Sequence, residues 1–518
     1  MGKRESILEW YRRQHKFMDA PCGGRGDCGR CKIKFLSNAP EASERELLKL
    51  SEEEIKQGIR LACMTEKNGQ IEKTDFIWID EIFWGNKERT YVDEQEEFAT
   101  PSEKISEVYP KQERAFGIAL DIGTTTLVIR LVELREDGNF FTWTSMNHQR
   151  IYGADVISRI QAANEGKLKE LQGCIKRDIY ALLGNALIET GILAKQIKKI
   201  VVAGNTTMCH LLLGYSCEGL GKAPFEPVNI SLTKMSFYEL FKDIGWNTEE
   251  KINLTDIKAE VTILPGISAF IGADIVAGMY CCDMDLKEET YMLLDIGTNG
   301  EMVIGNKNGF KAASTAAGPV FEGGNISCGM PAVTGAISHI KDGQYEVLGK
   351  IKPKGICGSA IIDLAAYLFQ KCIIDENGTL SEEYFDDGYL LSECVNAELT
   401  NIKLTQQDIR ELQMGKGAIR AGIEVLLQYA IPDQIYLAGG FGTAIDVKSA
   451  CCIGLLPKEV EKKVISVGNT VIEGLHKYLM DPDGEARVIN ITKNVQEILL
   501  AETGKFEESY IHFMQFLV

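Results

Sequence analysis

One strand pattern occurs twice in this chain, and it constrains the fold more than any other feature. Residues 116–134 read FGIALDIGTTTLVIRLVEL, and residues 291–305 read YMLLDIGTNGEMVIG. Each copy is an apolar strand, the residues Asp-Ile-Gly-Thr and a second apolar strand, which predicts a β-hairpin with a tight turn. Because the copies lie far apart in the sequence, they predict two related lobes, each built around one hairpin.

The chemistry of these turns favours phosphate binding. A hairpin tip offers free backbone N–H groups and hydroxyls to a phosphate, and an aspartate at the strand end offers a hard oxygen to Mg²⁺ or to a water bound to it. We therefore expect Asp121 and Asp295 to be the catalytic carboxylates. The alternative is that each aspartate only caps a turn. The expected phosphate contacts are Gly123, Thr124, Thr125, Thr126, Gly297, Thr298, Asn299 and Gly300.

Two further carboxylates follow the second turn. Glu301 and Glu322 are candidates for orienting the attacking water, and an exposed carboxylate beside a turn explains them equally well. Their role stays open at this point.

A third element follows near the C-terminus. Residues 434–446 read QIYLAGGFGTAID, a strand of the buried type that breaks into glycines before a predicted helix. Glycines let the backbone approach a ligand closely, and a helix N-terminus adds its dipole. The expected nucleotide contacts are Gly439, Gly440, Phe441 and Gly442, and tight turning alone is the alternative.

The N-terminal region has a different chemistry. Residues 22–31 read CGGRGDCGRC, so Cys22, Cys28 and Cys31 form C-x5-C-x2-C, and Cys63 follows in RLACMT. Three close cysteines and a distant fourth favour a [2Fe-2S] cluster, since structural zinc usually takes two close pairs. The glycines allow the sharp turns of such a loop. Zinc and unmetallated thiols remain alternatives.

The cysteines predict a β-grasp ferredoxin-like module. The segment ILEWYRRQ predicts a helix, and CKIKFL and QIEKTDFIWID predict strands. Only 21 residues precede Cys22, so we expect either a module that lacks its first hairpin or a natural start upstream of Met1. Residues 86–115 are charged and lack an apolar period, which is typical of a linker or a solvated surface segment.

Composition limits the partners. The 56 basic and 74 acidic side chains give a net charge of -18, which disfavours nucleic acid and anionic membranes. A charged N-terminus and the lack of 18 consecutive apolar residues predict a cytoplasmic protein. Most of the remaining cysteines are expected to be buried thiols, and His210 a packed core histidine. A homodimer is one assembly that the sequence leaves open.

The order of hairpin, second hairpin and strand with glycine turn resembles the phosphate-1, phosphate-2 and adenosine motifs of the ASKHA superfamily, which includes actin and sugar kinases. Several segments are also similar to the ASKHA part of the reductive activators of corrinoid enzymes: VVAGNTTMCHLLLG (201–214), APFEPV (223–228), LPGISAFIGADIVAG (264–278), STAAGPVFEGGNISCGMPAVTGAIS (314–338), GICGSAIIDL (355–364) and LTQQDIRELQMGKGAIRAGI (404–423). Those proteins join a [2Fe-2S] module to an ATP-binding domain.

The resemblance implies an α/β fold with four parts. These are a [2Fe-2S] ferredoxin-like module (1–80), a linker (81–114) and the two lobes of an ASKHA domain (115–285 and 286–518). It also implies ATP, Mg²⁺ and a cluster on Cys22, Cys28, Cys31 and Cys63. The implied activity is the reduction of Co(II) to Co(I) in a corrinoid protein of a methyltransferase system, with a separate electron donor.

Other functions stay open. Small-molecule kinases share the three nucleotide motifs, but they have no need of the cysteines. An ATP-driven electron activator of another low-potential enzyme is a second alternative. A third is an ATP-dependent binding factor that holds no cluster.

Overall fold

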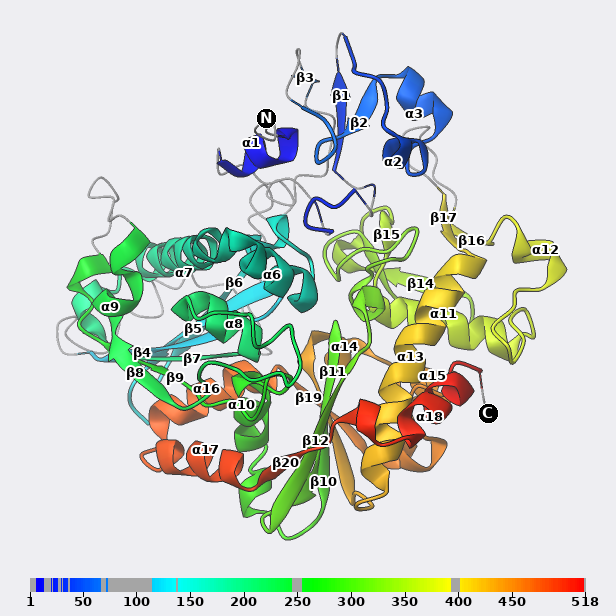
Figure 1. Cartoon of the computed structure of the whole chain (residues 1–518). Coiled ribbons are helices and arrows are strands. Elements are labelled where there is room, and N and C mark those ends of the chain that lie inside the picture. Colours follow the sequence, from blue (N-terminus) through cyan, green and yellow to red (C-terminus); the bar gives the residue numbers. More distant parts are fainter. Residues whose placement is uncertain are drawn as a thin grey trace. The chain divides into compact units, whose positions relative to one another are not determined.

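The computed structural model describes residues 6–13, 20, 22–26, 29, 31–35, 38–66, 71–72, 114–136, 138–244, 254–392 and 401–516 (Figure 1). Cys28 and almost all of the predicted linker lie outside these residues. The chain divides into two compact units, one of Met1–Ala273 with Leu475–Pro482 and one of Asp274–Gly474 with Asp483–Val518. The domain boundaries drawn from the sequence stay predictions.

The first unit contains a six-stranded sheet in the order β6-β5-β4-β7-β9-β8. The first copy of the repeated pattern forms its hairpin, β4 antiparallel to β5, and β4 also runs parallel to β7. The strands are β4 (Phe116–Ile122), β5 (Thr126–Glu133), β6 (Phe140–Met146), β7 (Ile197–Gly204), β8 (Thr233–Ser236) and β9 (Glu260–Ile263).

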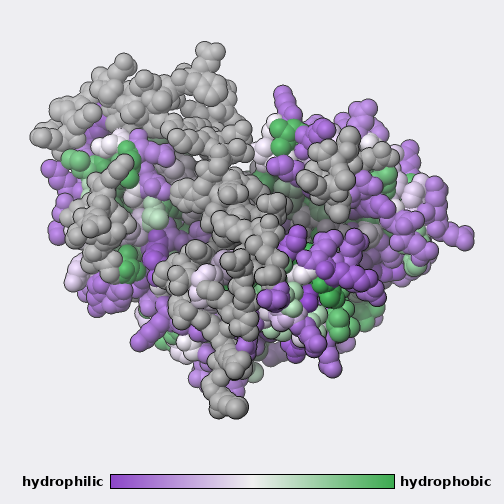
Figure 2. Space-filling view, turned by 90° about the horizontal axis from the view of Figure 1, so that it is seen from above, coloured by the Kyte–Doolittle hydropathy of each residue, from purple (hydrophilic) through white to green (hydrophobic). Residues whose placement is uncertain are grey.

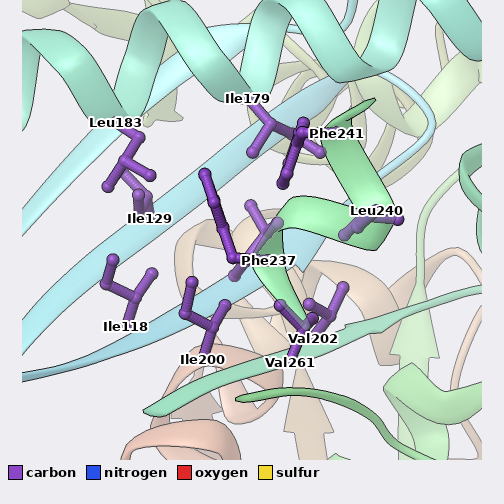
Figure 3. A pocket seen from close by; sticks show the side chains of 11 residues that line it. Ile118, Ile129, Ile179, Leu183, Ile200, Val202, Phe237, Leu240, Phe241 and Val261 are labelled. Carbon is purple, nitrogen blue, oxygen red and sulfur yellow. The ribbon is translucent and has the colours of Figure 1, made fainter. Parts of the chain in front are cut away.

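Apolar side chains fill the space between this sheet and its helices (Figure 3). Ile118 and Ile200 point from the sheet toward Leu183 of α7 (Leu168–Thr190), and Phe237 and Phe241 of α9 (Phe237–Phe241) complete the lining. The remaining void is about 10 Å³. An apolar void of this size is a packing gap in the core, too small for an organic ligand.

The second unit repeats the arrangement. Its six-stranded sheet has the order β19-β18-β10-β11-β12-β20. The second copy of the pattern is a hairpin, β10 antiparallel to β11, and β10 runs parallel to β18. The predicted pair of related α/β lobes is thereby confirmed. The strands are β10 (Tyr291–Ile296), β11 (Asn299–Asn306), β12 (Gly309–Ala316), β18 (Gln434–Ala438), β19 (Val464–Gly468) and β20 (Val495–Glu497).

Long helices cover the second sheet. α13 (Gln406–Leu427) packs on β11 and β12 and against α18 (Lys505–Phe513). It begins at a capping box in which the Thr405 side chain accepts from the Asp408 N–H, a pairing that satisfies free donors at the helix start. The second unit also contains α11 (Gly358–Gln370), α12 (Glu382–Phe385), α15 (Val447–Cys452) and α17 (Gly484–Lys493). The first unit contains α6 (Val156–Ala162) and α8 (Thr206–Leu213). The residues of α10 (Ala273–Cys281) and α16 (Thr470–Met480) are divided between the two units.

Two smaller sheets belong to the second unit. One has the order β14-β13-β15, and the other pairs β16 with β17. Their strands are β13 (Ala336–Lys341), β14 (Gln344–Val347), β15 (Gly355–Ile356), β16 (Tyr389–Ser392) and β17 (Ile402–Leu404).

The N-terminal residues form a small sheet in the order β2-β1-β3, antiparallel throughout. The predicted helix is α1 (Ile7–Arg13) and the predicted strand is β1 (Lys32–Phe35), so both are confirmed. Of the segment QIEKTDFIWID only β3 (Ile71–Glu72) is described. The remaining elements are β2 (Ile59–Leu61), α2 (Glu44–Leu47) and α3 (Glu52–Lys56).

On the face shown in Figure 2, the described residues are mostly hydrophilic. In the view of Figure 2, hydrophobic residues form small patches separated by hydrophilic ones. Across the described ranges, the structure has no helix with the length and apolar character needed to span a membrane.

Candidate functional site

The first turn closes on itself in the first unit. Gly123 N donates to Thr126 O over 2.9 Å, and Asp121 lies at the strand end, partly buried, in register with Ala203 of β7. The turn therefore places the side chains of Thr124 and Thr125 directly after a rigid strand, as the sequence predicted.

Two fully buried side chains donate hydrogen bonds to the backbone carbonyls of this turn. Asn147 Nδ2 donates to Gly123 O over 2.9 Å, and the guanidinium of Arg159 donates to Thr124 O over 2.6 Å. Burial lowers the pKa of Arg159 to about 9. A buried charge is costly without hydrogen-bond partners. The Arg159 cation therefore favours the backbone position in which Thr124 O accepts its hydrogen bond.

Asn205 is a third support for the same turn. It follows β7 directly, and its Nδ2 donates to Thr124 Oγ1 over 3.1 Å. The sequence analysis missed its role, although the signal was present. The segments VVAGN and YLAGG occupy equivalent positions, because β7 and β18 each run parallel to the strand that ends in the aspartate.

The second turn gathers carboxylates. Asp295 of β10 lies directly opposite Glu301 of β11 in the ladder. Burial raises the pKa of Asp295 to about 6. Burial also raises the pKa of Glu301 well above its usual range, with further contributions from the charges of Asp274 and Asp295. Asp274, in the first turn of α10, is a residue that sequence reasoning did not single out.

One prediction about the turns needs correction. The turns were expected to present free backbone N–H groups, but Gly123 N donates to Thr126 O and Gly297 N donates to Asn299 O. Thr298 N donates to Oε1 of Glu322 over 3.0 Å, and Thr298 Oγ1 donates to the same oxygen over 2.7 Å. Tight turns satisfy their own donors where they can.

The glycine turn touches the same aspartate. Gly439 has a φ of +82°, and a Cβ built on it would lie 2.7 Å from Asp295 Oδ1. Glycine is needed here both for the left-handed backbone and for the close approach. The predicted helix, α14 (Gly439–Ala444), starts at the glycines themselves rather than after them.

Other predicted contact residues have packing roles in this structure. A Cβ on Gly300 would meet Ile419 Cδ1 at 2.0 Å, and one on Gly442 would lie 3.1 Å from Leu437. The ring of Phe441 packs against Phe321, with centroids 4.8 Å apart. Gly440 has open space around it. The nucleotide contacts assigned to these residues stay predictions.

His210 is a packed core histidine, as expected. It is buried, its Nδ1 is 2.8 Å from Thr206 O, and its Nε2 accepts from Val228 N. Burial lowers its pKa.

The N-terminal thiols lie close together. Cys22 and Cys31 are buried, and the sulfurs of Cys31 and Cys63 are 3.2 Å apart. The hydrogen bond between the Cys31 and Cys63 thiols lowers the pKa of Cys31, although burial and the Cys22 charge oppose the shift. A lowered pKa favours the thiolate that binds a metal. Cys28 lies outside the described residues.

The loop around these thiols has the backbone that the sequence predicted. Gly23, Gly24, Gly26 and Gly29 all have positive φ, the region in which a Cβ is disfavoured. The guanidinium of Arg12 donates to Gly23 O over 2.9 Å and places a cation beside the loop. Thiol donors and a loop of this backbone fit an iron-sulfur cluster.

The thiol group is incomplete as described. No three His, Cys, Asp or Glu side chains among the described residues are arranged to hold a metal ion. The assignment of a cluster to the four cysteines thus remains a prediction.

Family models match most of the chain. The model described as the C-terminal domain of RACo, the ASKHA domain, matches residues 289–517, and the model of the RACo middle region matches residues 116–287. Both strand repeats lie inside these matches.

Curated relatives agree with the family models. The chain is 34% identical over 433 residues to the corrinoid activation enzyme RamQ of Eubacterium limosum, covering 77% of this chain and 70% of that protein. It is 23% identical over 448 residues to a [Co(II) methylated amine-specific corrinoid protein] reductase of Methanosarcina barkeri, covering 76% of each. A stretch of 47 residues, 9% of the chain, is 45% identical to one component of the Na(+)-translocating NADH-quinone reductase of Mannheimia succiniciproducens.

A solved structure matches along the whole chain. The reductive activator for corrinoid,iron-sulfur protein superposes with a TM-score of 0.69 at 27% identity, covering 100% of this chain and 96% of that one. The chain therefore belongs to the RACo family of reductive activators of corrinoid proteins, with the ASKHA fold in its C-terminal part.

Proposed function

We propose that this chain is an ATP-dependent reductive activator that transfers one electron to Co(II) of a partner corrinoid protein and leaves Co(I). The observation that carries the proposal is the combination, in one member of the family, of a thiol-lined glycine loop and a duplicated Asp-Ile-Gly-Thr hairpin. Neither feature alone requires both electrons and ATP.

The residues have separate roles in this proposal. Cys22, Cys28, Cys31 and Cys63 hold a [2Fe-2S] cluster, which when bound supplies a one-electron carrier with a reduction potential of about -400 mV. Arg12 keeps the loop in place through Gly23 O. Each Co(II) that becomes Co(I) takes up one electron, so a separate donor must be oxidised by one electron for each Co(I) formed.

The ATPase role belongs to the two turns. Thr124, Thr125 and Thr298 bind phosphate oxygens, and Asp121 and Asp295 hold Mg²⁺ and orient water. Asp295 has the more constrained environment, because Glu301 lies opposite it and Gly439 lies against its Oδ1. A carboxylate fixed in this way needs little reorganisation during hydrolysis.

ATP is needed if the Co(II)/Co(I) couple has a lower reduction potential than the cluster, because electron transfer from the cluster to cobalt then has an unfavourable free energy. Each mismatch of about 59 mV in a one-electron transfer costs about 1.4 kcal/mol. Binding and hydrolysis of ATP can offset that cost if the partner binds one nucleotide state better than the other. The partner is a corrinoid protein of a methyltransferase system, and the reaction takes place in the cytoplasm.

Substitution of one thiol tests the redox half of the proposal. In protein reconstituted anaerobically with iron and sulfide, Cys31→Ser should remove the visible absorption and the reduced-state S = 1/2 signal while ATP binding persists. The matched control is Cys372→Ser, an exposed cysteine of the second unit. A normal spectrum in Cys31→Ser would exclude this thiol as a ligand and contradict the cluster assignment.

A further inference from the structure

The carboxylate of Glu322 occupies the donors of the second turn. Its Oε1 accepts from both Thr298 N, over 3.0 Å, and Thr298 Oγ1, over 2.7 Å. These are the two donors that the proposed function assigns to a phosphate oxygen. A carboxylate oxygen and a phosphate oxygen are both anionic acceptors that take short, charge-assisted hydrogen bonds, so Glu322 makes the contacts that a nucleotide phosphate would make.

The segment that carries Glu322 is attached to the same turn at its other end. Gly318 N donates to Thr298 O over 3.0 Å. The short helix Pro319–Glu322 lies between Gly318, with φ +77°, and Gly323, with φ +78°. Glycines in the left-handed region allow the chain to change direction without a Cβ clash. The four residues of this short helix therefore begin and end at glycines where the chain changes direction.

Charge makes joint occupation unfavourable. Asp274, Asp295 and Glu301 already interact electrostatically at this turn. A polyphosphate that arrived while Glu322 remained would bring further negative charge to donors already in use. One backbone N–H and one hydroxyl hydrogen cannot serve a carboxylate and a phosphate fully at the same time.

We propose that the Glu322 carboxylate accepts the two hydrogen bonds of Thr298 when no nucleotide is bound, and that it gives up these donors when a nucleotide phosphate binds. The proposal rests on the proposed function and adds a regulatory step to it, the release of Pro319–Glu322 by nucleotide. Phe321 of this segment packs against Phe441 of α14. The release therefore reaches the glycine turn within the same unit.

Binding of two probes to Glu322→Gln tests the displacement. The amide keeps the shape of the side chain and removes its charge, so calorimetry with the Mg²⁺ complex of a non-hydrolysable ATP analogue should show affinity raised about tenfold, equivalent to 1.4 kcal/mol. Adenosine, which has no phosphate, should bind wild type and variant equally. Glu346→Gln, at an exposed position of β14, removes the same charge and should change neither affinity.

Unchanged or weaker binding of the analogue to Glu322→Gln would overturn the proposal. The wild-type protein gives a second measurement that needs no variant to fold. Amide hydrogen exchange in residues 318–323 should become faster when the analogue binds, and slower exchange there would also overturn the proposal. If the wild type binds no nucleotide at all, the proposed function itself fails; if the wild type binds nucleotide but Glu322→Gln binds it no more tightly, only the displacement fails.

Discussion

At the scale of single residues, Asp295 combines a costly environment with a proposed catalytic role. Its pKa of about 6 reflects burial of a carboxylate. Since the folded state binds this proton more tightly than the unfolded state, the free energy of unfolding falls as the pH rises from about 4 to about 6, and the loss persists at higher pH. Residues kept at such a cost are often functional.

Asp295→Asn is therefore expected to suppress ATP hydrolysis and to stabilise the fold. At pH 7.5 the free energy of unfolding should rise by about 1–3 kcal/mol. The gain should disappear toward pH 4, where the wild-type carboxyl is protonated in the folded state. Turnover assays and denaturant unfolding measure the two effects. Asp433→Asn, at the opposite end of the strand pair, should leave turnover intact; normal hydrolysis in Asp295→Asn would exclude a catalytic role.

Lys416 predicts a different pH dependence. Its side chain is fully buried, and Nζ donates over 2.6 Å to the carbonyls of both Phe513 and Gln515. Burial lowers its pKa to about 7. Between pH 7 and about 10 the unfolded chain holds this proton and the folded protein does not, so wild-type stability rises with pH in that window.

Lys416→Met removes this titration. Relative to the variant, the wild type should gain up to about 1.4 kcal/mol per pH unit above pH 7, measured by urea unfolding between pH 6 and pH 9. Lys462→Met, at an exposed position, serves as the control. A difference between wild type and Lys416→Met that stays constant with pH would contradict the assignment.

At the scale of elements, the hairpins and the glycine turn could be predicted from the sequence, whereas the residues that contact these turns from other segments could not. β4–β5, β10–β11 and β18 each arise from one continuous apolar run with a local turn signal. Asn147, Arg159 and Asp274 come from other segments, and no local pattern distinguishes them. Only the folded chain brings them to the turns, so their roles could not be read from spacing.

The glycine turn offers a paired test. Gly439→Ala should cost about 1–2 kcal/mol through its left-handed backbone, and its Cβ should displace Asp295 and reduce ATP turnover at least about tenfold. Gly468→Ala, with φ +71° and no atom near its Cβ, imposes the same backbone strain alone. It should lose stability but keep turnover. Equal turnover in both variants would show that the contact with Asp295 has no catalytic importance.

At the scale of the whole molecule, the proposed function joins two kinds of chemistry that the sequence predicted from separate motifs. The ASKHA fold and the family are confirmed by the repeated sheets and by the related proteins. The cysteine module is less complete, because one of its four predicted ligands lies outside the described residues. Local glycine and cysteine spacing predicted the loop, whereas the proposed coupling of ATP to electron transfer would depend on the assembled protein and its partner and has no local sequence pattern.

The most direct test of that coupling is anaerobic. Reduced protein is mixed with a corrinoid protein in the Co(II) state, with and without Mg²⁺ and ATP, and the absorption band of Co(I) is followed. We predict that the band appears with ATP, fails to appear without it, and fails to appear with ATP in Asp295→Asn. A Co(I) band of equal size and rate without ATP would contradict the account.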